Sequence, residues 1–432
     1  MKKKIQFLAI ALAFVGFIAQ AQSPKAKSGT FALTHANIET VTKGVITNGT
    51  IIIQKGKITA VGTNVTVPVD AIVIDCTGKW IYPGMIDGGT QVGLLEMGQI
   101  PQASDVREGG QIVPQMKALT AVNPSSAVIP VTRVSGVTTV ITAPAGGMFP
   151  GTAALISLHG YVPDQMFAGF EGVVLNFPDQ ARRGSYDRRT DEEIKKEVEK
   201  TTKQLNDVWD KAVQYYKLDS ATKGKGLTYY PEMEALLPVI RGEQALMIEV
   251  NAVMDIKAAL KWVADRKVKK VIFTGVSEGW RLADEIAKAK ISVVVGPVLE
   301  EPIREYDRYD RAYANAGLMK KAGVTIALRT SQAENARNLP YMAGFAATYG
   351  LGREEALKAV TISAAQIFGV ADKLGSIEVG KIANLFVCDG DPFETKTNVL
   401  DVFIEGWQMP MVSRQTQLYD EFLKRDPGVN KN

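Results

Sequence analysis

The sequence predicts an α/β fold in which a (β/α)₈ barrel of the TIM type is joined to a smaller β-sandwich domain. Residues 81–375 alternate short, β-branched apolar runs with helical patterns, as repeated strand–helix units do. The flanking segments, 29–80 and 376–415, read instead as short strands that break at glycines. The 432 residues, 46% apolar and 22% charged, suit one large barrel with an accessory domain and exclude disordered and coiled-coil classes.

The first 21 residues have the pattern of a secretory signal peptide. A basic start at residues 2–4 precedes the apolar segment 5–18, and Ala-Gln-Ala at 19–21 is a small-x-small cleavage site. The apolar segment is shorter than the roughly 20 residues that span a membrane, and no second run of that length follows. We therefore expect cleavage near Ala21, a periplasmic or secreted product, and no membrane span after cleavage.

The two terminal β-rich segments are expected to form one domain that is discontinuous in the sequence. Strand-like stretches such as TIIIQKGKITAVG and AIVIDCTGKW precede the barrel, and ANLFVCDGD and VLDVFIEGWQ follow it. Cys76 and Cys388 lie at the ends of such stretches, one in each terminal segment. An exported compartment permits a disulfide, but free cysteines are also often buried, so the spacing leaves the pairing open.

The middle of the chain carries the strand–helix units. ALMIEV precedes the helical pattern DIKAALKWVADRK, and KKVIFTG precedes EGWRLADEIAKAK. Such short apolar runs are typical of buried parallel strands. A doubly wound open sheet is the alternative, but no glycine-rich phosphate loop follows any strand. Near 181–226 a helical insertion interrupts the alternation, and Thr190 with Glu193 predicts a capping box at its start.

Charge and histidine content exclude two classes of function. Three of the net +4 charges come from the lysines of the predicted signal peptide, so the mature chain has no electrostatic footprint for nucleic acid. The chain has two histidines, His35 in the predicted sandwich and His159 at the end of the run ALISLH. Because histidine is the commonest ligand of catalytic zinc, a histidine-rich metal centre is excluded.

Residues 78–94, GKWIYPGMIDGGTQVGL, resemble the amidohydrolase superfamily, specifically its imidazolonepropionase-like branch. In that family this segment reads P-G-[LF]-I-D-x-H-x-H, and both histidines bind a metal. Four motif residues are present here: Pro83, Gly84, Ile86 and Asp87. The two metal positions are instead Gly89 and Gln91.

The resemblance extends over about 29–410 and includes a C-terminal signature, EEALKAVTISAAQIFGVADKLGSIEVGKIANLFVCDGDP. By the same alignment Glu249 and Thr274 stand at two further histidine positions. Ser331, or Gln332 one step on, stands where the family has an aspartate. The resemblance implies a barrel with a β-sandwich, and hydrolysis of non-peptide C–N bonds in amides and cyclic amides with zinc or another divalent metal.

The substitutions lead to two competing hypotheses. A hydrolytic metal centre needs about three or four converging N, O or S ligands, and these positions supply one carboxylate, Glu249. We therefore expect no cofactor or metal, and a catalytically impaired or non-catalytic member that serves as a binding or assembly subunit. The alternative is an active amide hydrolase with an unusual oxygen-rich or metal-free site at the barrel mouth. Its candidate residues are Gln91, Glu249, Asn251, Thr274, Ser331 and Gln332.

Partners follow from the same resemblance. The expected ligand is a small amide-type molecule. Both a homodimer and a heteromer with a paralogue that keeps the intact metal motif remain open.

Overall fold

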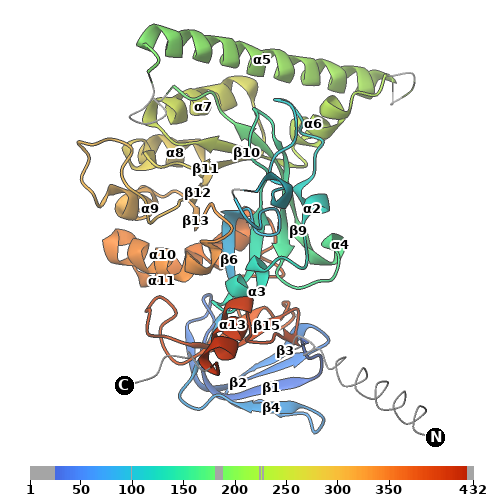
Figure 1. Ribbon diagram of the computed structural model, residues 1–432, viewed down its shortest axis with the longest axis vertical. Coiled ribbons are helices and arrows are strands. Elements are labelled where there is room, and N and C mark those ends of the chain that lie inside the picture. The colour runs from blue at the N-terminus through green and yellow to red at the C-terminus, as the bar shows by residue number, and fades with distance from the viewer. Residues whose placement is uncertain (1–24, 99, 181–187, 223–224, 226–227, 426–432) are drawn as a thin grey trace, which may run out of the picture.

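The computed structural model describes residues 25–98, 100–180, 188–222, 225 and 228–425. The predicted signal peptide, residues 1–21, lies outside the described residues. Figure 1 shows a β-rich domain at one end of the molecule, the barrel in the middle, and the long helix α5 across the opposite end. Within the described residues, no helix is both long enough and apolar enough to cross a membrane.

The barrel is an eight-stranded sheet in the order β13-β12-β11-β10-β9-β8-β7-β6, with β13 and β6 also in contact. Its strands are β6 (Met85–Thr90), β7 (Val137–Thr142), β8 (Gly151–Ser157), β9 (Phe167–Asn176), β10 (Ala245–Val250), β11 (Val271–Gly275), β12 (Ser292–Val295) and β13 (Ile326–Leu328). All six residues of β6 and all six of β7 are buried, as expected for strands covered on both faces. The prediction of a TIM-type barrel is confirmed.

One strand of the barrel departs from the all-parallel arrangement of a TIM barrel. β8 pairs antiparallel with both β7 and β9, whereas every other neighbouring pair in this sheet is parallel. Residues 143–150 join β7 to β8 without a helix, and a parallel connection would need a crossover of a dozen or more residues. The C-terminal end of β8 therefore lies at the end of the barrel where the parallel strands begin.

Helices surround the barrel. They are α2 (Ala118–Ala121), α3 (Val128–Arg133), α4 (Pro163–Met166), α5 (Asp191–Thr222), α6 (Pro231–Arg241), α7 (Val253–Arg266), α8 (Ala283–Ala289), α9 (Arg311–Lys321), α10 (Leu339–Ala346), α11 (Arg353–Ala359) and α12 (Ile362–Ile367). The C-terminal helix α13 (Arg414–Leu423) follows the β domain and contacts α3. Four short turns of helix complete them: η1 (Pro101–Ala103), η2 (Gly279–Arg281), η3 (Ala336–Asn338) and η4 (Ala347–Leu351).

Helix α5 fills most of the predicted insertion. The expected capping box is present before it, since the Glu193 backbone N–H donates to Thr190 Oγ1 at 3.2 Å and the Thr190 N–H donates to Glu193 Oε2 at 2.7 Å. On its inner side Trp209 packs edge-on against Trp262 of α7, with ring centroids 5.1 Å apart. The helix is thus fixed to the outside of the barrel by an aromatic contact.

The β-rich domain is built from both ends of the chain, as predicted, and its strands form one sheet. Its order is β16 (Trp407–Gln408), β15 (Val399–Ile404), β14 (Leu385–Cys388), β5 (Trp80–Pro83), β1 (Phe31–Glu39), β2 (Val45–Gln54) and β3 (Lys57–Gly62), and β4 (Ile72–Asp75) also pairs with β1. The C-terminal β14 pairs antiparallel with the N-terminal β5, and in this register Cys388 lies opposite Trp80. Both cysteines are buried free thiols, and burial raises the pKa of each to about 12.

Asn384 connects the β domain to the barrel. Its carbonyl oxygen accepts the N–H of Gly84, which lies just before β6, and its side-chain amide donates to Thr139 of β7 at 3.3 Å. Its side-chain oxygen also accepts the N–H of Glu405 at 2.7 Å. These bonds fix the start of the first barrel strand, and with it the position of the residues at the far end of that strand.

Candidate functional site

A cavity of about 210 Å³ opens at the C-terminal ends of the barrel strands. This mouth cavity is lined by all five residues at the aligned metal-ligand positions: Gly89, Gln91, Glu249, Thr274 and Ser331. Glu249 of β10 lies in register with Asn176 of β9 and Thr274 of β11, so neighbouring strands present these side chains together. The other two sequence candidates lie outside the lining. Asn251 donates to Glu249 Oε1 at 3.1 Å, and the exposed Gln332 accepts from Asn335.

Arg329, which the sequence analysis missed, also lines this cavity. Its Nη1 and Nη2 each donate to one Glu249 oxygen at 2.7 Å, and its Nε donates to the Gly296 carbonyl at 3.0 Å. Thr274 also donates to Glu249, at 2.6 Å. Burial alone would raise the pKa of Glu249, yet the charge and hydrogen bonds of Arg329 hold it below its ordinary value. Glu249 is therefore an ionised carboxylate with both oxygens engaged.

Two glycines make room for this ion pair. A Cβ atom at Gly89 would lie 3.1 Å from Arg329 Cδ, so the arginine fills the space beside the position of the family's first histidine. Gly275 has a φ of +83°, and a Cβ there would lie 2.3 Å from Asn251 Oδ1 and 2.7 Å from Glu249 Oε1. A side chain at residue 275 would clash with Asn251 and Glu249, and one at residue 89 would require Arg329 to shift.

The motif carboxylate Asp87 supports the cavity from behind. It is fully buried and accepts hydrogen bonds from the Gly89 N–H at 3.0 Å, the Thr330 N–H at 3.1 Å and Thr330 Oγ1 at 2.5 Å. Burial raises the pKa of Asp87 to about 7, although these hydrogen bonds act in the opposite direction. Asp87 thereby ties the end of β6 to the residues that follow β13.

Ser331 is held beside Gly89 in an unusual conformation. Its N–H donates to the Gly89 carbonyl at 2.9 Å, and its φ of 68° lies in the left-handed region that non-glycine residues seldom adopt. Its Oγ is buried and has no hydrogen-bond partner within the described part of the chain. Among the described residues that line the mouth cavity, Ser331 alone has a buried side-chain polar atom without a hydrogen bond.

The metal centre that the resemblance implies does not fit these residues. Gly89 has no side chain, Gln91 carries a neutral amide, and the Glu249 oxygens are engaged by Arg329, Thr274 and Asn251. Across the described ranges, no group of three or more His, Cys, Asp or Glu side chains is placed to hold a metal ion. The chemistry of the donor set thus argues against a resident metal at the mouth.

Neither histidine reaches the mouth cavity. His35 lies in β1 of the β domain, where its exposed ring contacts Asp75 at 3.0 Å. His159 follows β8, and the antiparallel direction of that strand places it at the opposite end of the barrel. A serine–histidine or metal–histidine site at the mouth is therefore excluded by position.

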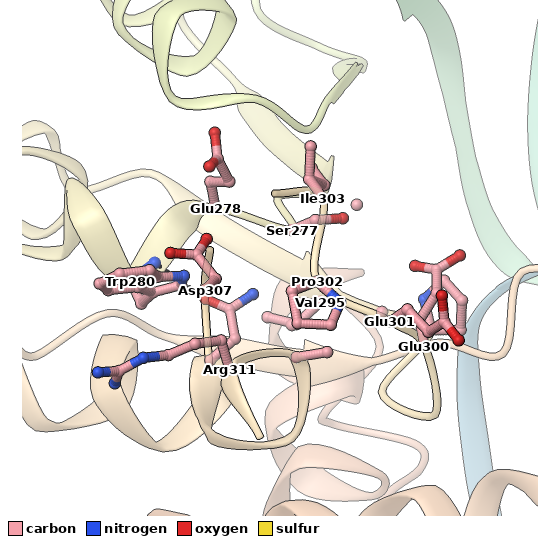
Figure 2. A pocket seen from close by; sticks show the side chains of 15 residues that line it. Ser277, Glu278, Trp280, Val295, Glu300, Glu301, Pro302, Ile303, Asp307 and Arg311 are labelled. Carbon is pink, nitrogen blue, oxygen red and sulfur yellow. Dashed lines mark hydrogen bonds between the residues drawn. The ribbon is translucent and has the colours of Figure 1, made fainter. Parts of the chain in front are cut away.

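A second, much smaller pocket lies beside the mouth, and Figure 2 shows Glu278 and Asp307 among the side chains that line it. Both acids form ion pairs that the sequence analysis also missed. Glu278, almost fully buried, accepts the Val253 N–H at 2.7 Å and also pairs with Arg281 and Arg304. Arg281 donates twice to Asp307, at 2.6 and 2.7 Å. About 20 Å³ remains, which is room for roughly one water molecule. These contacts fix the segment between β12 and α9 rather than forming a ligand site.

Comparisons with known proteins identify relatives. A model of the amidohydrolase family matches residues 125–409. The imidazolonepropionase of Shouchella clausii (strain KSM-K16) is 40% identical over 86 residues, a match that spans 19% of this chain and 19% of that protein. The crystal structure of an amidohydrolase from Thermotoga maritima MSB8 has a TM-score of 0.76 at 25% identity and covers 89% of this chain and all of that one. Molinate hydrolase shares the fold at 18% identity, with a TM-score of 0.55, over 89% of this chain and 95% of that one.

Proposed function

Because this chain belongs to the amidohydrolase family and yet carries an arginine–glutamate pair among the family's ligand positions, we propose that it is a non-hydrolytic member. Its mouth cavity binds a small amide-type ligand without cleaving it. The observation that carries this proposal is the contact of Arg329 with both oxygens of Glu249. The chain is exported to the periplasm, as the N-terminal sequence suggests.

The residues of the mouth cavity support binding rather than hydrolysis because none of them can activate water. A general base works best with a pKa near the working pH, whereas the pKa of Glu249 is lowered and both its oxygens are occupied. Asp87 has a pKa of about 7 but is fully buried behind Gly89. The guanidinium of Arg329 supplies positive charge, but it cannot generate a bound hydroxide as a metal ion does.

The polar groups that remain free suit an amide. Three of the five N–H bonds of Arg329 are used by Glu249 and Gly296, which leaves two donors for a carbonyl oxygen. Ser331 Oγ can accept from an amide N–H, and Gln91 lines the same cavity. A volume of about 210 Å³ restricts the ligand to a small molecule.

The proposal is tested with the mature, full-length protein and hydantoin as a small cyclic-amide probe. We expect hydantoin to bind by isothermal titration calorimetry and to be recovered without hydrolysis. Ser331→Ala should weaken binding by about tenfold through loss of one hydrogen bond, whereas the neighbouring exposed Gln332→Ala should not change it. Turnover of hydantoin that disappears in Ser331→Ala would instead support the alternative, an active metal-free hydrolase.

Elemental analysis tests the same proposal independently of any ligand. We expect far less than one zinc, iron or manganese per chain in protein purified without chelator. The variant Gly89→His/Gln91→His should also stay metal-poor, because Arg329 fills the space beside residue 89 and already engages Glu249. One tightly bound transition metal per wild-type chain would contradict the proposal.

Export is tested by cell fractionation and N-terminal sequencing. We expect the protein in the periplasmic fraction with its N-terminus at or near Gln22. A cytoplasmic product that retains residues 1–21 would contradict this part of the proposal.

A further inference from the structure

Another cavity, of about 520 Å³, lies at the end of the barrel opposite the mouth cavity. We call it the His159 cavity; its wall includes Arg133, His159, Tyr161, Ile129, Leu158 and Met166. It lies between the end of β8 and helix α3, whose last residue is Arg133. Among the described residues that line it there is no aspartate or glutamate, and its charged side chains are the half-buried Arg133 and the exposed Lys25.

Arg133 is poorly paired for a half-buried arginine. Its Nη1 donates to the Leu158 carbonyl at 3.4 Å, a long hydrogen bond, and its Nε is buried without a partner in the described part of the chain. Nη2 likewise has no hydrogen bond to any described residue. By contrast, Arg281, Arg329 and Arg353 each donate to a carboxylate.

This arrangement calls for an anion. Arginine keeps its charge in proteins, and the Nε atom of this guanidinium is buried without a hydrogen bond, within the described part of the chain, to compensate its loss of water. Its place at the C-terminus of α3 helps only slightly, since a six-residue helix offers one or two turns of aligned peptide dipoles. A carboxylate bound by both terminal nitrogens would satisfy the group in the manner of the other arginines.

The rest of the wall is aromatic and apolar. The His159 ring lies 6.2 Å from the ring of Tyr161 and 5.5 Å from that of Trp407. Burial, and then the charge of Arg133, lower the pKa of His159, so its ring is neutral at pH 7 and adds no charge to the cavity. Ile129, Leu158 and Met166 supply apolar surface. A cavity of this size and character is larger than an inorganic anion needs.

We propose that the His159 cavity binds a small organic carboxylate, with the carboxylate on Arg133 and an apolar or aromatic body against His159 and the apolar wall. The site is separate from the mouth cavity, and its existence does not depend on the function proposed there.

The two histidines of the chain provide a direct test by proton NMR. Phenylacetate, titrated into the mature full-length protein, should shift the ring resonances of His159 in a saturable way and leave those of the exposed His35 unchanged. His35→Gln assigns the two sets of signals. Phenylacetamide has the same body without the charge and should bind at least about tenfold more weakly. Equal shifts by acid and amide, or no saturable shift of His159, would overturn the proposal.

A variant pair then identifies the cation. Arg133→Met should weaken phenylacetate binding at least about tenfold, whereas Lys321→Met, which removes an exposed charge on α9, should leave it unchanged. Thermal unfolding of Arg133→Met shows whether the variant is folded, and the comparison of acid with amide on the wild-type protein holds even if it is not. A folded Arg133→Met that binds as the wild type does would also overturn the proposal.

Discussion

At the barrel mouth, Arg329 brings a permanent positive charge to a place where the family has metal ligands. Its charge compensates the negative charge of Glu249. Burial raises the pKa of Glu300, although the charge of Arg329 acts in the opposite direction. A partly buried ion pair costs desolvation free energy and is stable only with good geometry and further hydrogen bonds. The bonds from Thr274, from Asn251 and to Gly296 meet that condition.

The strength of this pair can be measured at single residues. Arg329→Met should lower the free energy of unfolding by about 3–5 kcal/mol, because Glu249 would keep its burial without a counter-charge. Adding Glu249→Gln should recover part of the loss, since it removes the uncompensated charge. Urea unfolding of the wild type, both single variants and the double variant gives the coupling. Additive effects of the two substitutions would show that the side chains do not act as a pair.

Asp87 leads to a prediction about pH. Its pKa is raised to about 7 in the folded protein from an ordinary value of 3.8, so the folded state binds the proton more tightly than the unfolded state does. The contribution of Asp87 to stability should therefore be fully present below about pH 4 and decline as the pH rises towards 7. Asp87→Asn cannot titrate, so the difference in unfolding free energy between wild type and variant should shrink or reverse over that range. A difference that is flat from pH 4 to 7 would contradict this.

The residues of the site were only partly predictable. Alignment with the family motif located Gly89, Gln91, Glu249, Thr274 and Ser331, and the structure brings them together in one cavity. Arg329 carries no motif of its own. The available signal was its place two residues before Ser331, since alternate residues of an extended segment face the same side. That rule does not reveal a partner on another strand, and so the contact with Glu249 required the fold.

At the scale of elements, strand β8 shows that the hydrophobic pattern of a segment does not predict the direction of a strand. Its seven residues are all buried, and such a run looks the same in a parallel or an antiparallel strand. The direction of β8 depends on the connection that precedes it, where residues 143–150 lack the length of a helical crossover. This direction decides that His159 lies away from the mouth and beside Arg133, and both residues line the His159 cavity.

Helix α5 offers a prediction at the same scale. Trp209 is 3% exposed and packs on Trp262, so Trp209→Ala should lower the free energy of unfolding by about 3–5 kcal/mol. Leu218→Ala, on the same helix but at a half-exposed position, should change it by less than about 1 kcal/mol. Urea unfolding of the two variants measures both. Similar losses would mean that α5 is not anchored through its tryptophan.

For the whole molecule, the discontinuous β domain was predictable because its pattern is visible at both ends of the chain. Short β-branched strands with glycine breaks flank a long alternating region, and a strand with an unpaired edge favours pairing with another. The order of the strands was not predictable, since it depends on long-range contacts such as the edge-on packing of Phe31 against Phe403 at 5.2 Å.

Because strands from both ends of the chain pair in one sheet, the whole chain should unfold in a single cooperative transition. Removing residues 376–432 deletes β14, β15 and β16, leaves β5 without its antiparallel partner, and exposes the core around Phe31 and Tyr82. We expect that truncated chain to be insoluble, or to lack a sharp unfolding transition. Removing only residues 412–432 deletes α13, which has no buried side chain, and should leave a soluble protein that unfolds cooperatively. The expectation rests on the pairing of β14 with β5, in which Cys388 lies opposite Trp80 and Leu385 opposite Pro83. A chain that ends at residue 375 and is nevertheless soluble, with a cooperative unfolding transition, would show that the barrel folds without β14.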